Sequence, residues 1–162
     1  MIIRDITVSD FNEVLEINER SVNYLSPLEL ERLEELLGQS KYSKVIEQDK
    51  QIAAFIIAFD QSSKYSSPNF LWFKERYKSF LYIDRIVVHE NYRRMGLADN
   101  LYSDIFRFAK NMNYECITCE IDSRPPNVGS MKFHDKYEFI EVGTQWLYNG
   151  EKQVSLRERK LQ

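Results

Sequence analysis

Two arginines and a glycine stand where a predicted strand meets a predicted helix. The segment reads Arg93-Arg94-Met95-Gly96-Leu97-Ala98, after a β-branched apolar run and before an amphipathic stretch. The N-terminus of a helix leaves backbone N–H groups unpaired and carries a partial positive charge, which suits phosphate oxygens. A glycine lets the backbone approach a ligand closely, and arginines add charge-assisted hydrogen bonds. The segment therefore predicts a diphosphate clamp, although a plain solvated turn can have the same composition.

Carboxylates interrupt two of the predicted strands. Asp84 and Glu120 each stand in an otherwise apolar run. By strand alternation, Asp84 is expected to share a face with Tyr82, Ile86 and Val88. Burial would raise the pKa of either carboxyl group toward the value that a general base needs. Alternatively, each carboxylate pairs with a nearby arginine, such as Arg85 or Arg124, as part of the structure.

The chain has one pair of cysteines, Cys116 and Cys119, in a C-x-x-C spacing. A zinc site would need a second pair of ligands, and the sequence offers no further Cys-x-x-Cys or histidine pair. On a strand, residues three apart point to opposite faces. We therefore interpret both as buried structural cysteines and expect no metal.

The composition is that of an ordinary globular protein. The 162 residues are 43% apolar and 29% charged, with a net charge of −3. A mildly acidic chain gives no reason to expect nucleic acid as a partner. There is no apolar run near the roughly 18 residues that span a bilayer, and Met1–Asp5 lacks the layout of a signal peptide. We expect a cytoplasmic protein with no membrane partner.

Strand patterns alternate with helix patterns, which predicts an α+β protein with helices on both faces of a sheet. Strands are expected over 2–6, 44–47, 52–59, 80–88, 116–121, 139–142 and 154–157, the last after a hairpin at 149–150. Helices are expected after 7–10 and over 26–38, 96–113 and 128–137. For the second helix, Ser26 is the expected N-cap, with Pro27 at the first helical position and Glu29 in a capping box.

The segment 61–78 fits neither a core element nor a linker. It begins with serines and then carries the aromatic residues Tyr65, Phe70, Trp72, Phe73 and Tyr77. One interpretation is a lid over an acceptor site, with ring faces that favour a hydrophobic or cationic amine. The other is a dimer interface or a flap packed on the core.

Two motifs in this order and spacing resemble the GCN5-related N-acetyltransferase (GNAT) superfamily, in a bacterial-type member. The turn at 93–98 is similar to the family's Arg/Gln-x-x-Gly-x-Gly/Ala, and the segment 127–139 is similar to its Asn-…-Phe-Tyr-x-Lys-x-Gly-Phe. The resemblance implies one three-layer α+β domain over 1–162. It has a mixed, mostly antiparallel sheet of six to seven strands and about four helices on both faces.

The resemblance also implies a function. It is direct transfer of an acetyl group from acetyl-CoA to a primary amine of a small molecule or peptide, by an enzyme that needs no metal. The alternative is a non-catalytic CoA-binding module or a protein-interaction domain on the same fold. A homodimer is possible in either case.

Cofactor roles follow from the resemblance. The cofactor-binding residues that it implies are Ile86, Val87, Val88, Arg93, Arg94, Met95, Gly96, Leu97, Ala98, Asn127 and Ser130. Backbone at 86–88 should pair with the pantetheine arm like a further strand. An N–H group near Val87 or Val88 should polarise the thioester carbonyl. The segment 93–98 should hold the pyrophosphate mainly by its backbone.

Departures from the second motif bear on the proton donor. The family's tyrosine, which often protonates the departing CoA thiolate, is His134 here, and the family's glycine is Glu138. His134 could donate the proton, since the pKa of histidine lies near neutrality, or it could only hold the cofactor. Tyr137 is the alternative donor. The candidate bases are Asp84 and Glu120, unless a water chain removes the proton.

Acceptor contacts are expected after the first helix, where this family often places them. The residues concerned are Asn18, Glu19 and Tyr24. The other interpretation of these side chains is simple solvation.

Overall fold

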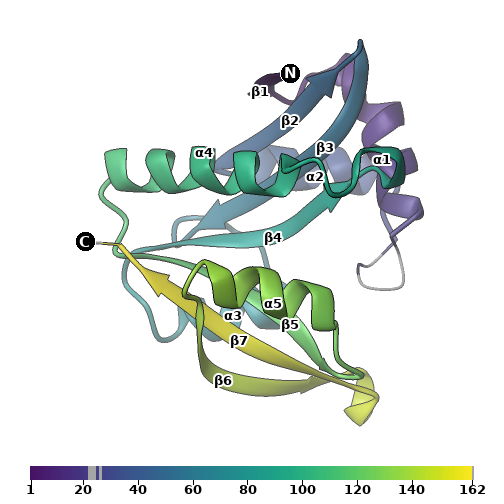
Figure 1. Cartoon of the computed structure of the whole chain (residues 1–162). Coiled ribbons are helices and arrows are strands. Elements are labelled where there is room, and N and C mark those ends of the chain that lie inside the picture. Colours follow the sequence, from purple (N-terminus) through teal and green to yellow (C-terminus); the bar gives the residue numbers. More distant parts are fainter. Residues whose placement is uncertain (22–24, 26, 162) are drawn as a thin grey trace.

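The computed structural model describes residues 1–21, 25 and 27–161. In this part of the chain, seven strands form one sheet in the order β1-β2-β3-β4-β5-β7-β6 (Figure 1). The strands are β1 (Ile2–Asp5), β2 (Tyr42–Gln48), β3 (Gln51–Asp60), β4 (Phe80–Val88), β5 (Cys116–Arg124), β6 (Ile140–Leu147) and β7 (Lys152–Lys160). The pair β4 and β5 is parallel, and the other neighbours are antiparallel. The predicted mixed, mostly antiparallel sheet is confirmed.

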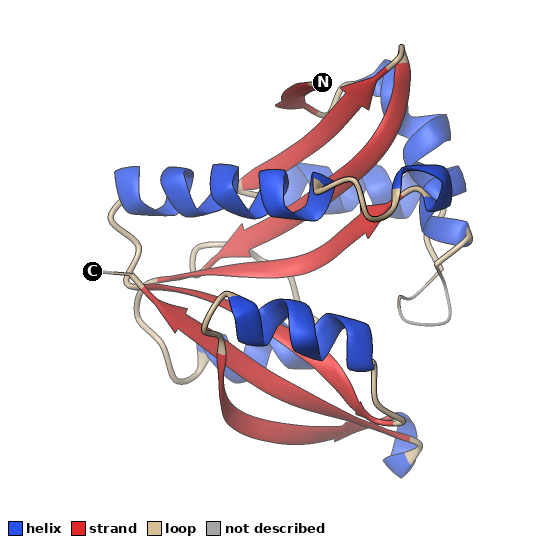
Figure 2. Ribbon diagram, in the orientation of Figure 1, coloured by secondary structure: helices blue, strands red, loops and turns tan. Residues whose placement is uncertain are grey.

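Helices cover both faces of this sheet (Figure 2). Those in the described residues are α1 (Phe11–Glu19), α2 (Leu30–Gln39), α3 (Pro68–Lys74), α4 (Leu97–Asn111) and α5 (Val128–Lys136). The first three pack on one face, and α4 and α5 pack on the other. The three-layer prediction is confirmed, with α3 as a helix that the sequence patterns did not predict.

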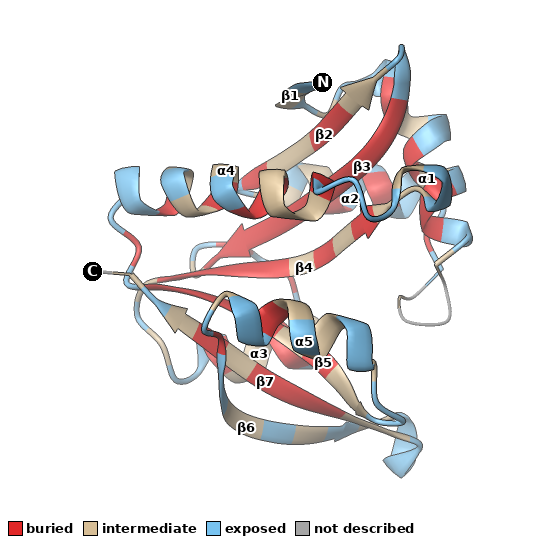
Figure 3. Ribbon diagram, in the orientation of Figure 1, coloured by how far each residue is buried: buried red, intermediate tan, exposed pale blue. Residues whose placement is uncertain are grey.

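The core lies in two clusters, one on each face of the sheet. Central strands are buried along most of their length, whereas β6 at the edge is largely exposed (Figure 3). Cys116 belongs to the cluster under α1–α3 and Cys119 to the cluster under α4 and α5. Both cysteines are buried and free. The prediction of two structural cysteines on opposite faces is confirmed.

Local sequence signals explain where several elements begin. Thr7 and Asp10 form a capping box at the 3₁₀ turn Val8–Asp10, directly ahead of α1, and a helix was expected after this segment. Asp49 and Lys50 take positive φ angles of 54° and 62°, which suits the tight turn of the β2–β3 hairpin.

The predicted start of the second helix is wrong. α2 begins at Leu30 with Glu29 at the N-cap, so Pro27 precedes the helix. The expected N-cap, Ser26, lies outside the described residues. An extended residue at Glu29, with a ψ of 165°, sets the observed boundary.

A β-bulge interrupts the pairing of β3 with β4. Arg85 pairs with Ile57, and Ile83 pairs with the next β3 residue, Ala58. Asp84 is therefore the extra residue of the bulge. The insertion inverts the side-chain alternation, so Tyr82 packs on the α1–α3 face, whereas Ile86 and Val88 pack on the α4–α5 face. The prediction that these three share a face with Asp84 is wrong.

The parallel pair β4–β5 is short. Only Phe80–Tyr82 of β4 pairs with β5, at Cys116–Thr118, and beyond this point the two described strands part. Figure 1 shows them diverging, with α4 over the first half of the sheet and α5 over the second. The backbone of β4 from 83 to 88 therefore has β3 on one side and a cavity on the other.

The aromatic segment 61–78 packs on the core, as one of its two interpretations predicted. Ser67 caps α3 by accepting a hydrogen bond from the backbone N–H of Phe70. Phe70 and Phe73 are fully buried against Phe80 and Tyr82 of β4.

Among the described residues, no helix is long and apolar enough to cross a membrane.

Candidate active site

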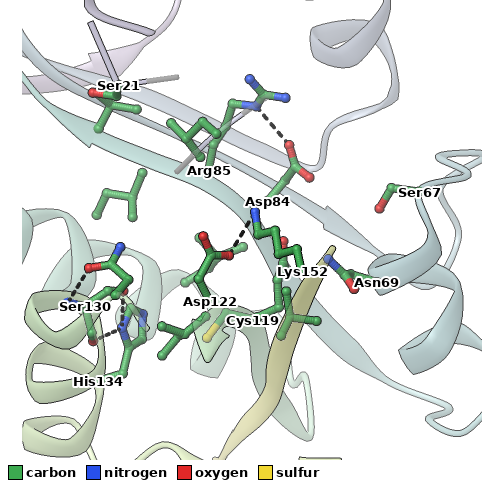
Figure 4. Close-up of a pocket in the computed structure, with 18 of the residues that line it drawn as sticks. Ser21, Ser67, Asn69, Asp84, Arg85, Cys119, Asp122, Ser130, His134 and Lys152 are labelled. Carbon is green, nitrogen blue, oxygen red and sulfur yellow. Dashed lines mark hydrogen bonds and ion pairs between the residues drawn. The ribbon is translucent and has the colours of Figure 1, made fainter. Parts of the chain in front are cut away.

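A cavity of about 750 Å³ lies where β4 and β5 part. Its walls come from β4 at 83–88, β5 at 119–122, the start of α3, the first two turns of α5, and β7. Figure 4 shows Ser130 and His134 on one side of it and Ser67 and Asn69 on the other. The cavity therefore spans the predicted cofactor groups at one end and the aromatic segment at the other.

The β4 edge presents an N–H group to this cavity. The N–H of His89 donates to the carbonyl of Ala53 on β3 at 2.8 Å. Val88 pairs with Ala54 in the same register. In an antiparallel ladder this pattern makes Val88 and Ala54 a non-hydrogen-bonded pair, so the N–H of Val88 points away from β3. The predicted donor for a thioester carbonyl is thus available at Val88.

The N-terminus of α4 is open. Gly96 is its N-cap residue with φ 76°, and a Cβ added there would meet nothing within 4 Å. No described side chain caps the helix, and its first backbone bond runs from Asn100 N–H to the Gly96 carbonyl. Three N–H groups before Asn100 are therefore free of intrahelical partners. This arrangement fits a diphosphate.

The residues of the predicted diphosphate clamp, 93–98, do not all line the cavity. Arg93 lines the cavity, and Arg94 and Met95 are exposed on the turn beside it. The side chain of Leu97 is buried in the core, so it anchors α4, and its contribution to a ligand would come from the backbone. Ala98 follows in the first turn of the helix.

Asn127 and Ser130 also line the cavity, from the start of α5. The side-chain oxygen of Asn127 caps α5 by accepting from the backbone N–H of Ser130 at 3.2 Å. This cap leaves the amide N–H₂ group of Asn127 as the donor for a ligand.

Glu120 is the carboxylate whose environment is most unusual. It lines the cavity, and the hydroxyl of Tyr82 donates to it at 2.6 Å. Burial and the neighbouring charge of Asp84 raise the pKa of Glu120 to about 8, against the opposing effect of hydrogen bonds from Tyr82 and Asn69. No ion pair joins it to Arg124 among the described contacts. The group can therefore exchange a proton near neutral pH.

Asp84 has a different environment. Its carboxylate forms an ion pair with Arg85 at 3.0 Å, and both side chains are buried. It also accepts a 2.7 Å hydrogen bond from the hydroxyl of Tyr65. Asp84 lines the cavity, but the structural pairing with Arg85 that the sequence left open is present.

His134 is held as a neutral ring. Its Nδ1 lies 2.7 Å from the carbonyl of Ser130, which can only accept, so the ring proton is on Nδ1. Its Nε2 then accepts from the hydroxyl of Tyr102 at 2.5 Å. Burial lowers the pKa of His134 to about 4. At neutral pH its single N–H is thus bonded to Ser130 and is not directed into the cavity.

Tyr137, the alternative donor, is turned elsewhere. Its hydroxyl donates to Asp99 of α4 at 2.5 Å, and burial with this contact raises its pKa to about 12. Tyr137 is not among the described residues that line the cavity. It ties α5 to α4 together with Lys136, which pairs with the same carboxylate.

The expected acceptor contacts are not brought together. Asn18 is buried and accepts from Arg85 at 3.0 Å, and Glu19 is exposed; neither is among the described cavity-lining residues. Tyr24 lies outside the described residues. Ser21 and Leu25 line the cavity from the same connection.

Comparison with known proteins decides the family. Residues 6–139 match the model described as "Acetyltransferase (GNAT) family". The chain belongs to the GNAT family. Membership makes it an acetyl-CoA-dependent N-acetyltransferase, and an amine acceptor is implied with it. No curated protein matches the sequence.

Several solved structures share the fold at low identity. Ard1 from Thermoplasma volcanium is 19% identical with a TM-score of 0.80, over 99% of this chain and 97% of that chain. The ribosomal-protein-S18-alanine N-acetyltransferase from Escherichia coli is 15% identical with a TM-score of 0.75, over 98% and 92%. The ribosomal-protein-alanine N-acetyltransferase from Brucella melitensis is 17% identical with a TM-score of 0.77, over 99% and 100%. At this identity the likeness shows the fold.

Sequence reasoning missed several residues of this GNAT site. They are Tyr65, Asn69, Tyr82, Tyr102, Asp122 and Lys152, all in contact with the cavity or with a group that lines it. Tyr82 could have been found from the sequence. When β4 and β5 are paired in parallel, Tyr82 lies opposite Thr118, which stands two residues before Glu120. Lys152 pairs with Asp122 at 2.9 Å, a contact between strands that no local pattern indicates.

Proposed function

We propose that this GNAT enzyme acetylates a primary α-amino group, at the end of a peptide or on a small molecule, with Glu120 as the general base. The observation that carries the proposal is Glu120 itself, a half-buried carboxyl group in the cavity that accepts from Tyr82 at 2.6 Å and has a pKa of about 8. An α-amino group has a pKa of about 7.7–8.0, whereas a lysine side chain has about 10.4. Proton transfer to Glu120 is therefore matched to an α-amine.

The charged groups at the acceptor end of the cavity also favour an α-amine as the acceptor. Asp84 is neutralised by Arg85, and Asp122 by Lys152. Figure 4 shows both ion pairs in the cavity wall. A polyamine would favour a surplus of carboxylates, which these pairs do not provide. An acceptor with one amine and neutral polar surroundings fits better, beside Ser21, Ser67 and Asn69.

On the cofactor side, this chain's own backbone does most of the binding. We place the pantetheine arm along 86–88, the thioester oxygen near Val88 N–H, and the pyrophosphate at the start of α4 with Arg93. Asn127 and Ser130 contact the arm from α5. Acetyl-CoA supplies the activated acetyl group, and no metal is needed for this reaction.

For the leaving sulfur, we propose that Tyr102 and His134 act together. Tyr102 lines the cavity, and its hydroxyl is held by Nε2 of His134. By rotating about its C–O bond, the hydroxyl can exchange its hydrogen bond to Nε2 for one to a developing thiolate, whose charge it then stabilises as a donor. His134 thus stands at the position of the family's donor residue but acts through Tyr102, and Tyr137 keeps its hydrogen bond to Asp99.

The names of similar proteins agree with an α-amine. Two of the fold relatives are named for acetylation of an alanine in a ribosomal protein. Their names apply to those proteins; for this chain they support the choice of the first acceptors to test. A homodimer and a cytoplasmic location stay predictions.

The experiment compares three acceptors with acetyl-CoA: a tetrapeptide with a free N-terminal alanine, the same peptide with a blocked N-terminus and an internal lysine, and spermine. Product is identified by mass spectrometry and rate by release of the CoA thiol. We expect turnover of the first peptide. Preferential turnover of lysine or spermine would contradict the α-amine proposal. Acetyl-CoA binding without turnover of any amine would favour the non-catalytic module.

A further inference from the structure

An ion pair between β5 and β7 lies in the wall of the cavity. The Nζ atom of Lys152 lies 2.9 Å from the Oδ1 atom of Asp122, and both residues line the cavity. Figure 4 shows the two side chains pointing toward one another among the lining residues. The side chains are 24% and 12% exposed. The pair is therefore largely withdrawn from bulk solvent and still reachable by a ligand in the cavity.

The sheet places this pair on the same face as the proposed base. Ile121 packs on the core under α4 and α5, so its neighbours Glu120 and Asp122 face the other side. Lys152 is paired with Leu147 of β6, which packs on the core under α1–α3. Directly opposite residues of an antiparallel pair share a face. Glu120, Asp122 and Lys152 therefore lie on one face of the sheet.

The spacing along β5 sets what can bridge the base and the lysine. Glu120 and Asp122 are two residues apart on an extended strand, which is about 7 Å. Within one amino-acid residue, an α-amine and a carboxylate oxygen are roughly 3–4 Å apart, and a hydrogen bond at each end adds about 3 Å. The terminal carboxylate of a tetrapeptide lies on the order of 10 Å from its amine. A carboxylate on the amine-bearing residue itself therefore fits this spacing.

Lys152 has hydrogen-bond donors to spare. An ammonium group carries three N–H donors, and among the described residues its ion pair with β5 uses one of them. The other cations that line the cavity have different duties. Arg85 is bonded to Asp84 and Asn18, each at 3.0 Å, and Arg93 stands at the cofactor end. The ammonium of Lys152 is therefore suited to receive a carboxylate at the acceptor end.

We propose that Lys152 selects the acceptor: its ammonium binds a carboxylate carried by the same residue as the reacting α-amine. This carboxylate is either the side chain of an N-terminal aspartate or the α-carboxylate of a free amino acid. The inference rests on the proposed function and narrows its substrate class. Asp122 holds the cation in the empty cavity, and the acceptor's carboxylate then shares it. The acceptor's own ammonium and carboxylate cancel in charge, as do the ion pairs of the wall.

The first test compares a tetrapeptide that begins with aspartate and the same peptide beginning with asparagine, which differ in one charge at nearly equal shape. We expect the wild type to favour the aspartate peptide by about tenfold or more in kcat/KM, mainly through KM. Lys152→Met, which keeps the length of the side chain, should lose this preference, and Lys152→Arg should restore it. A preference that survives in Lys152→Met would contradict binding of a side-chain carboxylate.

Alanine and alaninamide test the α-carboxylate as the other source. Their amines differ in pKa, so the quantity to compare is the ratio of the two rates in the wild type and in Lys152→Met. A fall of this ratio in the variant assigns the α-carboxylate of a free amino acid. An unaltered ratio together with a lost preference for the aspartate peptide assigns the side chain. Unaltered ratios in both pairs, or an equal loss for every acceptor, would indicate a merely structural ion pair and overturn the inference.

Two further variants separate the lysine from its partner and from lysines in general. Asp122→Asn removes the carboxylate that competes for the ammonium, so the preference for the charged acceptor should widen. An unchanged preference would contradict a shared ammonium. Lys44→Met is the matched control, because Lys44 forms a 2.7 Å ion pair with Asp5, is 26% exposed and does not line the cavity. It should keep the wild-type preference.

Binding of acetylated products tests Lys152 without turnover. The α-amide of N-acetylaspartate and free N-acetylalanine are each compared with the corresponding uncharged amide, by calorimetry on protein saturated with CoA. We expect the wild type to bind at least one charged product about tenfold more tightly than its amide, and Lys152→Met to bind both alike. No such difference in the wild type would overturn the inference even if α-amines are acetylated. Failure to acetylate any amine would instead refute the proposed function, while these affinities would still show whether Lys152 binds a carboxylate.

Discussion

The hydroxyl of Tyr82 donates a 2.6 Å hydrogen bond to Glu120 at the point where β4 and β5 part. Tyr82 is the last β4 residue paired with β5, and Glu120 lies two residues beyond its partner Thr118. The bond therefore closes the end of the paired region, and its acceptor Glu120 lines the cavity. This hydrogen bond thus marks the end of the β4–β5 pairing and also holds the proposed general base.

Replacement of Glu120 by Gln tests this group as the base. We expect kcat/KM for the free-alanine peptide to fall about 10²-fold or more, within the usual contribution of a general base. In the wild type the rate should rise with pH through about 8, because the carboxyl group must lose its proton to accept another. In Glu120→Gln the part of that rise that belongs to the carboxyl group should be lost, so that only the titration of the acceptor amine remains, and acetyl-CoA affinity by calorimetry should stay the same.

Glu115→Gln is the control for that variant, since Glu115 precedes the same strand and is exposed. It should leave the rate and its pH dependence unaltered. A profile of Glu120→Gln that rises as steeply as that of the wild type near pH 8 would assign the whole rise to other groups, such as the amine itself.

Gly96 provides a test of the cofactor end. Its φ of 76° is costly for any residue with a Cβ, by about 1–2 kcal/mol. In Gly96→Ala the turn should shift and the methyl group should occupy space beside the helix N-terminus, so we expect acetyl-CoA affinity to fall by about tenfold or more. Isothermal titration calorimetry measures the affinity directly.

Gly150→Ala separates backbone strain from loss of the binding turn. Gly150 has φ 89° and, like Gly96, nothing within 4 Å of an added Cβ, but it lies in the β6–β7 hairpin. The two variants should lose similar stability, and only Gly96→Ala should lose affinity. Equal affinity in both would remove the α4 N-terminus as the pyrophosphate site.

The sequence predicted the parts of this site that rest on local patterns. The turn at 93–98 and the amphipathic run after it are adjacent in the chain, so spacing alone placed a glycine at the start of this helix, where the structure has it at the N-cap of α4. Glu120 stood out because it interrupts an apolar strand. Gly96 and Glu120 could therefore be named before the fold was seen.

Other features depend on partners far along the chain. The bulge at Asp84 is set by the register with β3, and the hydroxyl that His134 Nε2 binds belongs to Tyr102, 32 residues earlier. α3 spans 7 residues, too short for helical periodicity to show, and its Asn69 gave no signal among the aromatic residues. Sequence patterns could not predict these features, because contacts between residues far apart in the chain determine them.

The contact between Trp72 and Gly143 can be tested by stability. In Gly143→Ala the new Cβ would lie 2.5 Å from the ring of Trp72, so the ring or α3 must shift. We expect a loss of about 1–3 kcal/mol in the free energy of unfolding, the usual cost of overpacking. Urea denaturation measures it. Gly38→Ala in α2, where nothing lies within 4 Å of the added Cβ, should be neutral or stabilising.

The buried ring of His134 predicts how stability depends on pH. Its pKa is lowered to about 4 from an ordinary value of 6.5, because burial disfavours the charged form. The folded state therefore favours the neutral ring, which stabilises the protein above pH 6.5 and ceases to do so as the pH falls toward 4. The change corresponds to about 3 kcal/mol. Glu120 acts in the opposite direction, since its raised pKa stabilises the fold as the pH falls from 8.

A comparison with His134→Gln isolates the histidine from Glu120 and the other acids. Glutamine keeps an acceptor for the hydroxyl of Tyr102 and does not titrate here. Urea denaturation at steps between pH 7 and 4.5 should show the wild type losing stability relative to the variant, most steeply below pH 6.5. Parallel curves for the two proteins would mean that the ring is not held neutral. In that case Tyr102 would lack the neutral acceptor that holds its hydroxyl. This result would contradict the proposed joint role of Tyr102 and His134.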